Sequence, residues 1–170
     1  MIHLNTGDGQ GKTTAATGLA VRALGQDRRV LFVQFLKGGE TGEVASLAKL
    51  GAEILRPAVA HGFWWTLDAE EREAVRREHD AILEETIRRC RSATPPDLLV
   101  LDEFTHVYNE EMADHALCDR LLDAVAGSVE TVLTGRNAGI LAARADYITE
   151  MKEIRHPYEL GIAARRGVEY

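Results

Sequence analysis

The sequence predicts an α/β fold in which a mostly parallel central sheet is flanked by helices. Runs that read as strands alternate with runs of helical periodicity along the whole chain, which is the pattern of βαβ units. Residues 98–101 are apolar without interruption, as expected of a strand that a parallel sheet buries on both faces. With 170 residues, 45% of them hydrophobic, and no internal repeat or long linker, the chain is expected to form a single domain over residues 1–170.

Each element has its own signal in the sequence. The first helix carries small and apolar residues on one face and is followed by Gly25. The long central helix opens at Asp68, which has the capping-box spacing with Glu71, and apolar residues then recur at helical intervals up to Cys90. In chain order we expect strands over residues 2–5, 29–36, 53–55, 97–101, 130–133 and 147–154, and helices over residues 13–24, 44–50, 68–90, 117–125 and 138–144.

Composition and charge narrow the classes of partner. The net charge is −7 and no basic stripe is visible, which is unfavourable for binding duplex nucleic acid. No apolar run approaches the roughly 20 residues of a membrane-spanning helix, and the N-terminus shows no secretory signal. Cys90 and Cys118 are too few for a disulfide framework and are expected to be buried free thiols. We therefore expect a cytoplasmic protein that binds neither nucleic acid nor a membrane.

The most informative segment is the glycine-rich turn between the first strand and the first helix. Its backbone N–H groups and the dipole of the helix favour a bound anion. Lys12 would bridge phosphate oxygens, and the Thr13 hydroxyl would bind Mg²⁺. The loop is one residue shorter than the common pattern G-x-x-x-x-G-K-[ST], because Thr6 stands where the first glycine would be. The alternative is a turn that binds nothing. The candidate nucleotide-binding residues are Gly7, Asp8, Gly9, Gln10, Gly11, Lys12, Thr13 and Thr14.

Two acidic residues, Asp102 and Glu103, end the apolar strand that begins near residue 97. A carboxylate at this place in a phosphate-loop protein faces the loop, where it holds Mg²⁺ directly or through water. Ordinary surface acids that stop a strand are the alternative, and the sequence leaves open which acid is the direct ligand. The six histidines show no metal-ligand spacing, and His79, on the apolar face of the long helix, is expected to be a hydrogen-bonded core residue.

Further candidates lie in loops that would reach the same edge of the sheet. Phe63, Trp64 and Trp65 follow one another before the long helix, either as core residues or as a surface for a large flat ligand or a partner. Arg136 and Lys37 each follow a strand. For each of them, the alternatives are a side chain that contacts phosphate and a solvated surface side chain.

These segments together resemble the ATP:corrinoid adenosyltransferases of the bacterial type. The likeness runs in order over nearly the whole chain, and its most specific parts are the shortened loop, the Gly-Phe-x-Trp element and the closing residues. The matching segments are residues 7–16, 33–38, 62–65, 101–103 and 134–136, followed by Gly161 and residues 166–170.

The resemblance implies a RecA-like phosphate-loop fold and a homodimer. It implies transfer of the 5′-deoxyadenosyl group of ATP to the cobalt of a reduced corrinoid, in the biosynthesis or salvage of adenosylcobalamin, with release of triphosphate. In that family ATP lies reversed along the loop, so that the ribose C5′ faces the corrinoid. By the match, Phe63 and Trp65 lie against the corrin and help to exclude its lower axial ligand, while Thr13 and Glu103 hold Mg²⁺. Lys12 stabilises the departing triphosphate.

The sequence departs from the family in three places. The family usually has an extension before the first strand that helps to cover the site. Here the first strand begins at Ile2, so we expect that cover to be missing or to come from another part of the protein. Gln10 stands where lysine is common, and Trp64 is an additional aromatic residue. A flavoprotein is one candidate for the reductant that supplies the reduced corrinoid. The other hypotheses are an ordinary phosphate-loop ATPase or kinase, and a nucleotide-binding module without catalysis.

Overall fold

A computed structural model describes residues 1–37, 39, 41–58 and 62–168. Gly38, Glu169 and Tyr170, which belong to the matching segments above, and His61, one of the six histidines, lie outside these ranges. Six strands form one sheet in the order β3-β2-β4-β5-β1-β6, and every neighbouring pair is parallel, which confirms the predicted fold class. The strands are β1 (Ile2–Thr6), β2 (Val30–Gln34), β3 (Glu53–Leu55), β4 (Leu98–Asp102), β5 (Glu130–Thr134) and β6 (Tyr147–Glu150).

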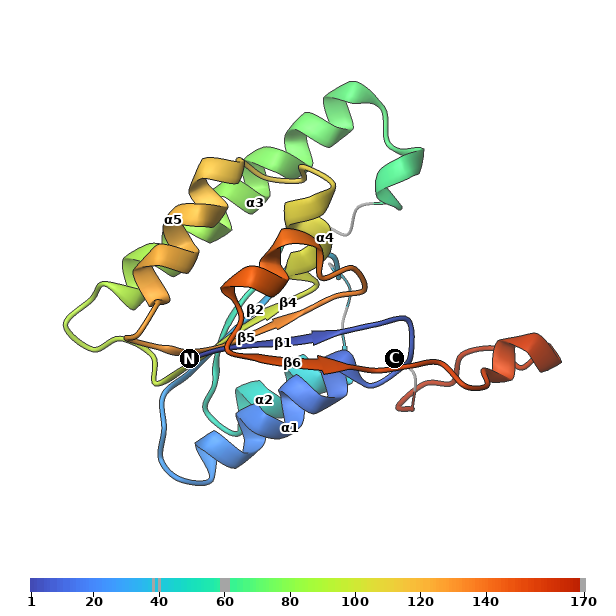
Figure 1. The fold of residues 1–170 in the computed structure, drawn as a ribbon, viewed down its shortest axis with the longest axis horizontal. Helices are drawn as coiled ribbons and strands as arrows, with labels where there is room; N and C mark the ends of the chain where they lie inside the picture. Colours follow the sequence, from blue (N-terminus) through green and yellow to red (C-terminus); the bar gives the residue numbers. More distant parts are fainter. Residues whose placement is uncertain (38, 40, 59–61, 169–170) are drawn as a thin grey trace.

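Helices cover both faces of the sheet, as Figure 1 shows. The α-helices are α1 (Lys12–Leu24), α2 (Gly42–Lys49), α3 (Ala69–Cys90), α4 (Phe104–Asn109) and α5 (His115–Val125), and the 3₁₀ turns are η1 (Trp64–Thr66), η2 (Gly139–Arg144) and η3 (Pro157–Leu160). Because side chains alternate along a strand, Leu99 and Leu101 pack under α3 and α5, while Leu98 and Val100 pack under α1 and α2. The result is a three-layer arrangement with two apolar cores.

The long helix α3 forms as the sequence predicts. The Asp68 carboxylate accepts a hydrogen bond from the Glu71 N–H at 2.9 Å, and the Glu71 carboxylate accepts one from the Asp68 N–H at 2.9 Å, which completes the capping box. His79 is buried in the core, where its ring nitrogens lie 2.9 Å from the Met112 carbonyl and 3.1 Å from the Phe35 carbonyl. The expectation of a core histidine is therefore confirmed. Both Cys90 and Cys118 are buried free thiols, as predicted.

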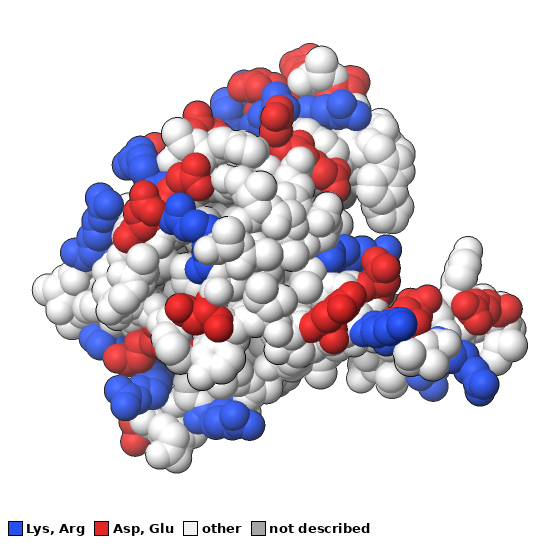
Figure 2. All heavy atoms as spheres, in the orientation of Figure 1, with Lys and Arg blue, Asp and Glu red and all other residues white. Residues whose placement is uncertain are grey.

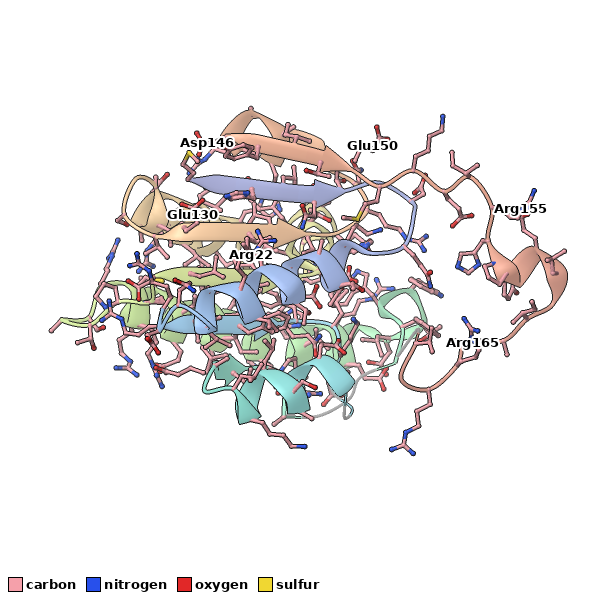
Figure 3. All side chains as sticks on the ribbon, turned by 90° about the horizontal axis from the view of Figure 1, so that it is seen from below. Arg22, Glu130, Asp146, Glu150, Arg155 and Arg165 are labelled. Atoms are coloured by element: carbon pink, nitrogen blue, oxygen red, sulfur yellow. The ribbon has the colours of Figure 1, made fainter. Side chains whose placement is uncertain are left out.

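Polar contacts fix the amino edge of the sheet. Asp97, just before β4, accepts hydrogen bonds from the backbone N–H and the guanidinium of Arg29, just before β2. The Arg29 contacts lower the pKa of Asp97 to about 2. Figure 3, seen from the side of α1 and α2, places Glu130 and Asp146 toward this same edge. There the Asp146 carboxylate accepts a hydrogen bond from the Ile2 N–H at 2.7 Å, which joins the start of β1 to the start of β6.

Two expectations about elements were wrong, and one helix was not predicted. The last strand ends at Glu150 and does not reach residue 154, because residues 151–153 leave the sheet to pack against the glycine-rich loop. The segment expected as a helix over residues 138–144 is the 3₁₀ turn η2. The six-residue helix α4 was not expected, since it is too short to show helical periodicity.

Beyond β6 the chain continues as an arm, residues 151–168, that runs away from the sheet and turns back (Figures 1 and 3). Figure 3 labels Arg155 on its outward course and Arg165 on its return. Several apolar side chains of the arm are exposed to solvent, namely Ile154, Tyr158, Leu160, Ile162 and Val168. Among the described residues, no helix combines the length and the apolar composition that crossing a membrane would require.

Candidate functional site: a cleft at the phosphate loop

The carboxyl ends of the parallel strands meet at one edge of the sheet, and a cleft of about 900 Å³ opens there. Its walls come from the glycine-rich loop, the start of α2, the segment after β4 and the arm. Of the residues that the sequence singled out, the cleft is lined by Asp8, Gly9, Gln10, Gly11, Lys12, Thr13, Thr14, Lys37, Glu103 and Arg136. Gly7 lies at the start of the same loop, and Asp102 is completely buried beneath it.

The loop between β1 and α1 requires glycine at particular places. Gly7 and Gly11 have φ of 98° and 108°, a backbone region that residues with a Cβ rarely adopt. Gly11 is the N-cap of α1, so the N–H groups of the first turn of that helix point into the cleft. Lys12 Nζ donates to the carbonyl oxygens of Gly7 at 2.7 Å and Gly9 at 2.6 Å. Burial lowers the pKa of Lys12.

The main chain of Met151 forms the outer wall of this loop. Its carbonyl oxygen accepts a hydrogen bond from the Gly9 N–H at 2.7 Å. A Cβ built on Gly7 would lie 2.5 Å from that oxygen, and one built on Gly9 would lie 2.7 Å from it, so neither position has room for a side chain. On the other side, the Arg136 carbonyl oxygen accepts from the Gly7 N–H at 3.1 Å and from the Thr6 hydroxyl at 2.6 Å. The loop is therefore held between the segments that follow β5 and β6.

Asp102 is the centre of a buried polar network. Its Oδ1 accepts hydrogen bonds from the Thr13 hydroxyl at 2.8 Å and from the Thr134 hydroxyl at 2.7 Å. Its Oδ2 accepts one from Gln34 Nε2 at 3.0 Å, and Lys37 Nζ lies 3.7 Å from the same atom. The carboxylate thus joins the ends of β2, β4 and β5 to the start of α1. Such a set of donors satisfies a charge that is fully removed from water.

Glu103 points toward the cleft from a strained backbone position. Its φ is 63°, in the left-handed region, and its N–H donates to the Thr134 hydroxyl oxygen at 2.9 Å. The Glu103 carboxylate lies 3.5 Å from Nε2 of His106, on the next turn of α4. Burial, and then the negative charge of Asp102, raise the pKa of Glu103. Ionisation of the Glu103 carboxyl group therefore costs more free energy than usual, and a cation bound in the cleft would offset that cost.

The donor set fits a Mg²⁺ ion that also takes ligands from a bound nucleotide. A hydroxyl (Thr13) and two carboxylates (Asp102 and Glu103) converge where the loop meets β4. Mg²⁺ commonly takes one or two protein oxygens together with phosphate oxygens and waters. Within the described residues, no group of three or more histidine, cysteine, aspartate or glutamate side chains is arranged to hold a metal by itself.

The aromatic segment divides into two outward residues and one inward residue. Phe63 and Trp65 are 69% and 71% exposed, and their rings stack with centroids 4.9 Å apart at an interplanar angle of 10°. Trp64 between them is half-buried and packs against the core. Neither Phe63 nor Trp65 lines the cleft. In Figure 2 the molecule is hollowed between the segment that carries η1 and the arm, at the edge where the strands end.

Sequence reasoning missed several residues that line the cleft or support it from behind. It did not assign a role to Gln34, although this side chain is a polar interruption at the end of the otherwise apolar strand β2. It gave no role to His106, which lies beside Glu103, or to Met151, whose contribution comes from the main chain and leaves no signal in its side chain. Glu153, His156, Gly167 and Val168 of the arm also line the cleft.

Comparisons with known proteins agree on one family. Residues 1–170 match the family described as ATP:corrinoid adenosyltransferase BtuR/CobO/CobP. The corrinoid adenosyltransferase of Pseudomonas aeruginosa is 34% identical over 179 residues, which cover 100% of this chain and 83% of that protein. The corrinoid adenosyltransferase CobA of Salmonella typhimurium is 32% identical, and the corrinoid adenosyltransferase of Escherichia coli K12 is 31% identical. Each of these two matches covers 100% of this chain and 85% of the relative.

Solved structures show the likeness in fold. The flagellar accessory protein FlaH of Methanocaldococcus jannaschii superposes with a TM-score of 0.53 at 13% identity, over 88% of this chain and 69% of that one. EssC (ATPases 2 and 3) of Geobacillus thermodenitrificans superposes with a TM-score of 0.52 at 15% identity, over 98% of this chain and 34% of that one. These likenesses are consistent with a RecA-like phosphate-loop fold. From its match over the full length and its curated relatives, the chain belongs to the family of ATP:corrinoid adenosyltransferases.

Proposed function

We propose that this chain transfers the 5′-deoxyadenosyl group of ATP to the cobalt of a reduced corrinoid, in adenosylcobalamin biosynthesis or salvage. The observation that carries the proposal is the pairing of two features at one edge of the sheet. One is a cleft of about 900 Å³ that contains a phosphate loop, and the other is an exposed stacked pair, Phe63 and Trp65, on a neighbouring segment. A phosphate loop alone would serve any nucleotide enzyme, whereas a large flat substrate requires an apolar surface beside it.

ATP is proposed to lie reversed along the loop, with its triphosphate gripped and its ribose C5′ turned outward. Two features support this. The loop is one residue shorter than the usual phosphate loop, and the N–H groups of Gly7 and Gly9 are already bonded to main-chain carbonyls. The triphosphate is therefore proposed to take its contacts from the N–H groups of the first turn of α1, from Lys12 and from Arg136. Gly7, Asp8, Gly9, Gln10, Gly11, Lys12, Thr13 and Thr14 form the nucleotide-binding loop in this proposal.

Mg²⁺ is proposed to bind at Thr13 and Glu103, and Asp102, the other carboxylate that the sequence offered as a ligand, is proposed to act through Thr13. Asp102 already accepts from three donors and has no exposed surface, so its role in this proposal is to orient the Thr13 hydroxyl from below. Glu103 faces the cleft and is the better placed carboxylate for the ion or for its water. When bound, Mg²⁺ would supply positive charge to the triphosphate oxygens.

The reaction needs no nucleophile from the protein, because reduced cobalt supplies the electron pair. The cobalt–carbon bond forms at C5′ of the ribose as the bond from C5′ to the triphosphate oxygen breaks, and the triphosphate leaves with that electron pair. Lys12, Thr13 and Glu103 are the proposed catalytic residues, through placement of the triphosphate and stabilisation of its charge. Phe63 and Trp65 are proposed to lie against the corrin and to help exclude its lower axial ligand, which makes the cobalt easier to reduce.

The finer properties of the protein belong to the same proposal. A homodimer is supported by the exposed apolar residues of the arm, which a second subunit could cover. A cytoplasmic location is supported by the two buried free thiols. A single domain over residues 1–170 is supported by the one sheet to which all described strands belong. A flavoprotein is proposed as the class of reductant.

The test is incubation of the protein with ATP, Mg²⁺ and a chemically reduced corrinoid, with the new cobalt–carbon bond followed by absorbance. We expect its formation to depend on protein, ATP and Mg²⁺. Nucleotide binding without any cobalt–carbon bond would indicate a binding module. ATP hydrolysis that is indifferent to corrinoid would indicate an ordinary ATPase. Either result would refute the proposal.

A further inference from the structure

The additional aromatic residue, Trp64, is held by two arginines of α3. The guanidinium carbon of Arg72 lies 5.2 Å from the centroid of the Trp64 ring, and that of Arg76 lies 5.6 Å from it. Both distances are within the range of a cation–π contact. Arg72 Nε also donates a hydrogen bond to the Trp64 carbonyl oxygen at 3.2 Å. Residues four apart on a helix share one face, so both arginines reach the same ring from the first turns of α3.

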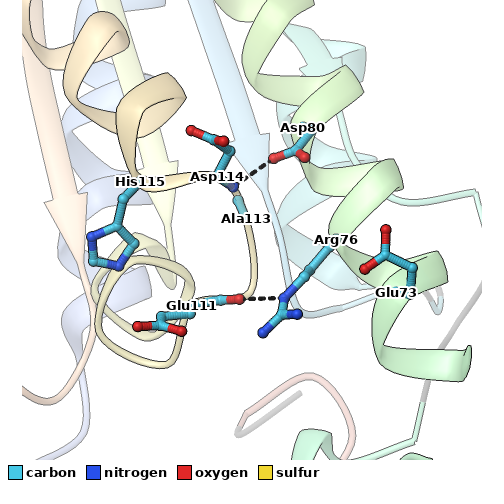
Figure 4. A pocket seen from close by; sticks show the side chains of 7 residues that line it. All are labelled: Glu73, Arg76, Asp80, Glu111, Ala113, Asp114 and His115. Carbon is cyan, nitrogen blue, oxygen red and sulfur yellow. Dashed lines mark hydrogen bonds between the residues drawn. The ribbon is translucent and has the colours of Figure 1, made fainter. Parts of the chain in front are cut away.

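Arg76 joins this contact to a second part of the molecule. Its Nε donates a hydrogen bond to the Glu111 carbonyl oxygen at 2.7 Å, across a pocket of about 380 Å³ between α3 and residues 111–115 (Figure 4). In the same pocket the Asp80 carboxylate accepts from the Asp114 N–H at 2.8 Å. These two bonds tie α3 to the connection between α4 and α5. The Trp64 ring is therefore fixed, through Arg76, to a frame that includes the core helices.

The neighbours of Trp64 have much less support of their own. Phe63 and Trp65 stack on one another and are mostly exposed. Two hydrogen bonds within the segment stabilise the turn η1. The Phe63 carbonyl oxygen accepts one from the Thr66 N–H at 2.8 Å and one from the Thr66 hydroxyl at 2.7 Å. They do not attach the turn to the helices. The half-buried Trp64 ring provides that attachment by packing against the core.

We infer that Trp64, clamped by Arg72 and Arg76, is a positioning residue that fixes the exposed Phe63–Trp65 pair against α3 for the corrinoid. The inference rests on the proposed function for the identity of the ligand. It assigns to the two arginines a role outside the nucleotide site. A rigid aromatic surface binds a flat ligand more tightly than a mobile one, because less conformational entropy is lost on binding. The clamp therefore affects corrinoid affinity and leaves ATP affinity unchanged.

The test compares four variants in steady-state adenosylation, with KM measured separately for reduced corrinoid and for ATP. We expect Trp64→Leu to raise the corrinoid KM about tenfold and Arg76→Gln to raise it about fivefold, with the ATP KM unchanged. Trp64→Phe keeps an aromatic face for the guanidinium groups and should stay within about twofold of the parent protein. Arg77→Gln is the matched control, since Arg77 lies on the same helix, its side chain is 66% exposed, and it pairs with Glu73 at 3.9 Å.

A second readout needs no corrinoid and separates this inference from the proposed function. The chain has two tryptophans, so Trp65 is the sole indole once Trp64 is replaced. We expect time-resolved fluorescence anisotropy to show faster local motion of Trp65 in Trp64→Leu than in Trp64→Phe. Equal motion in the two variants, or a corrinoid KM that rises no more than the ATP KM, would overturn the clamp. Absence of adenosylation in the parent protein would refute the proposed function, and the anisotropy would still decide the inference.

Discussion

The variant Gly9→Ala tests whether contact with the main chain of the arm holds the phosphate loop in its conformation. The new methyl group would lie 2.7 Å from the Met151 carbonyl oxygen and 2.8 Å from the Lys152 carbonyl carbon, where ordinary contacts are 3.4–4 Å. Both neighbours are main-chain atoms, so no side-chain rotation can relieve the contact. The displacement would also break the 2.7 Å hydrogen bond from the Gly9 N–H to Met151.

The expected cost follows from these contacts. Overpacking of this kind costs about 1–3 kcal/mol, and the lost hydrogen bond adds about 1 kcal/mol. We therefore expect the free energy of unfolding to fall by about 2–4 kcal/mol. Because the loop would no longer hold its shape, we expect ATP affinity to fall at least about tenfold, which corresponds to about 1.4 kcal/mol. Urea unfolding measures the first quantity, and isothermal titration with ATP measures the second.

Gly18→Ala is the matched control. Gly18 lies in α1, and a Cβ built there meets nothing within 4 Å. Since alanine favours the helix over glycine, this variant should gain about 0.5–1 kcal/mol and bind ATP as the parent protein does. If Gly9→Ala proved as stable as Gly18→Ala and bound ATP equally well, the packing of the arm against the loop would not be what holds it.

Further predictions concern the remaining parts of the site and core. Lys12→Ala should lower adenosylation about a hundredfold or more, because no other residue within the loop carries that charge, as initial rates would show. Asp102→Asn should lower the free energy of unfolding by about 2 kcal/mol in urea denaturation, since three donors lose their charged acceptor. Trp65→Ala should retain ATP affinity by titration yet weaken corrinoid adenosylation, and unchanged adenosylation would refute its role. Burial raises the pKa of Cys90 to about 11 and that of Cys118 to about 12, so both thiols should stay protonated and unreactive toward a thiol reagent at pH 8 until the protein is denatured.

The succession of strands and helices along the chain could be predicted because local sequence patterns determine it. Strand β4 is apolar throughout, and α3 has both a capping box and a continuous apolar stripe. The spacing of glycines around Lys12 placed the loop between β1 and α1, and the structure has it there. Where the pattern was too short, as in the six residues of α4, prediction failed.

Contacts between distant parts of the chain could not be predicted. The glycines at positions 7 and 9 were interpreted as part of an anion-binding turn, and nothing local identified the Met151 main chain as the close neighbour of both. The same contact explains why β6 ends at Glu150. The sequence left open whether the three consecutive aromatic residues belong to the core or to a binding surface. Trp64 is the inward one because it packs against the core and against the arginines of α3.

The most direct measurement of the central claim is the identity of the phosphorus product. Phosphorus-31 spectra of a reaction with ATP, Mg²⁺ and reduced corrinoid would distinguish the possible products within a single sample. Transfer of the adenosyl group predicts inorganic triphosphate in amounts equal to the adenosylated corrinoid. Formation of ADP and phosphate in its place would contradict the account, because the terminal phosphorus and not the sugar carbon would then be the reacting atom.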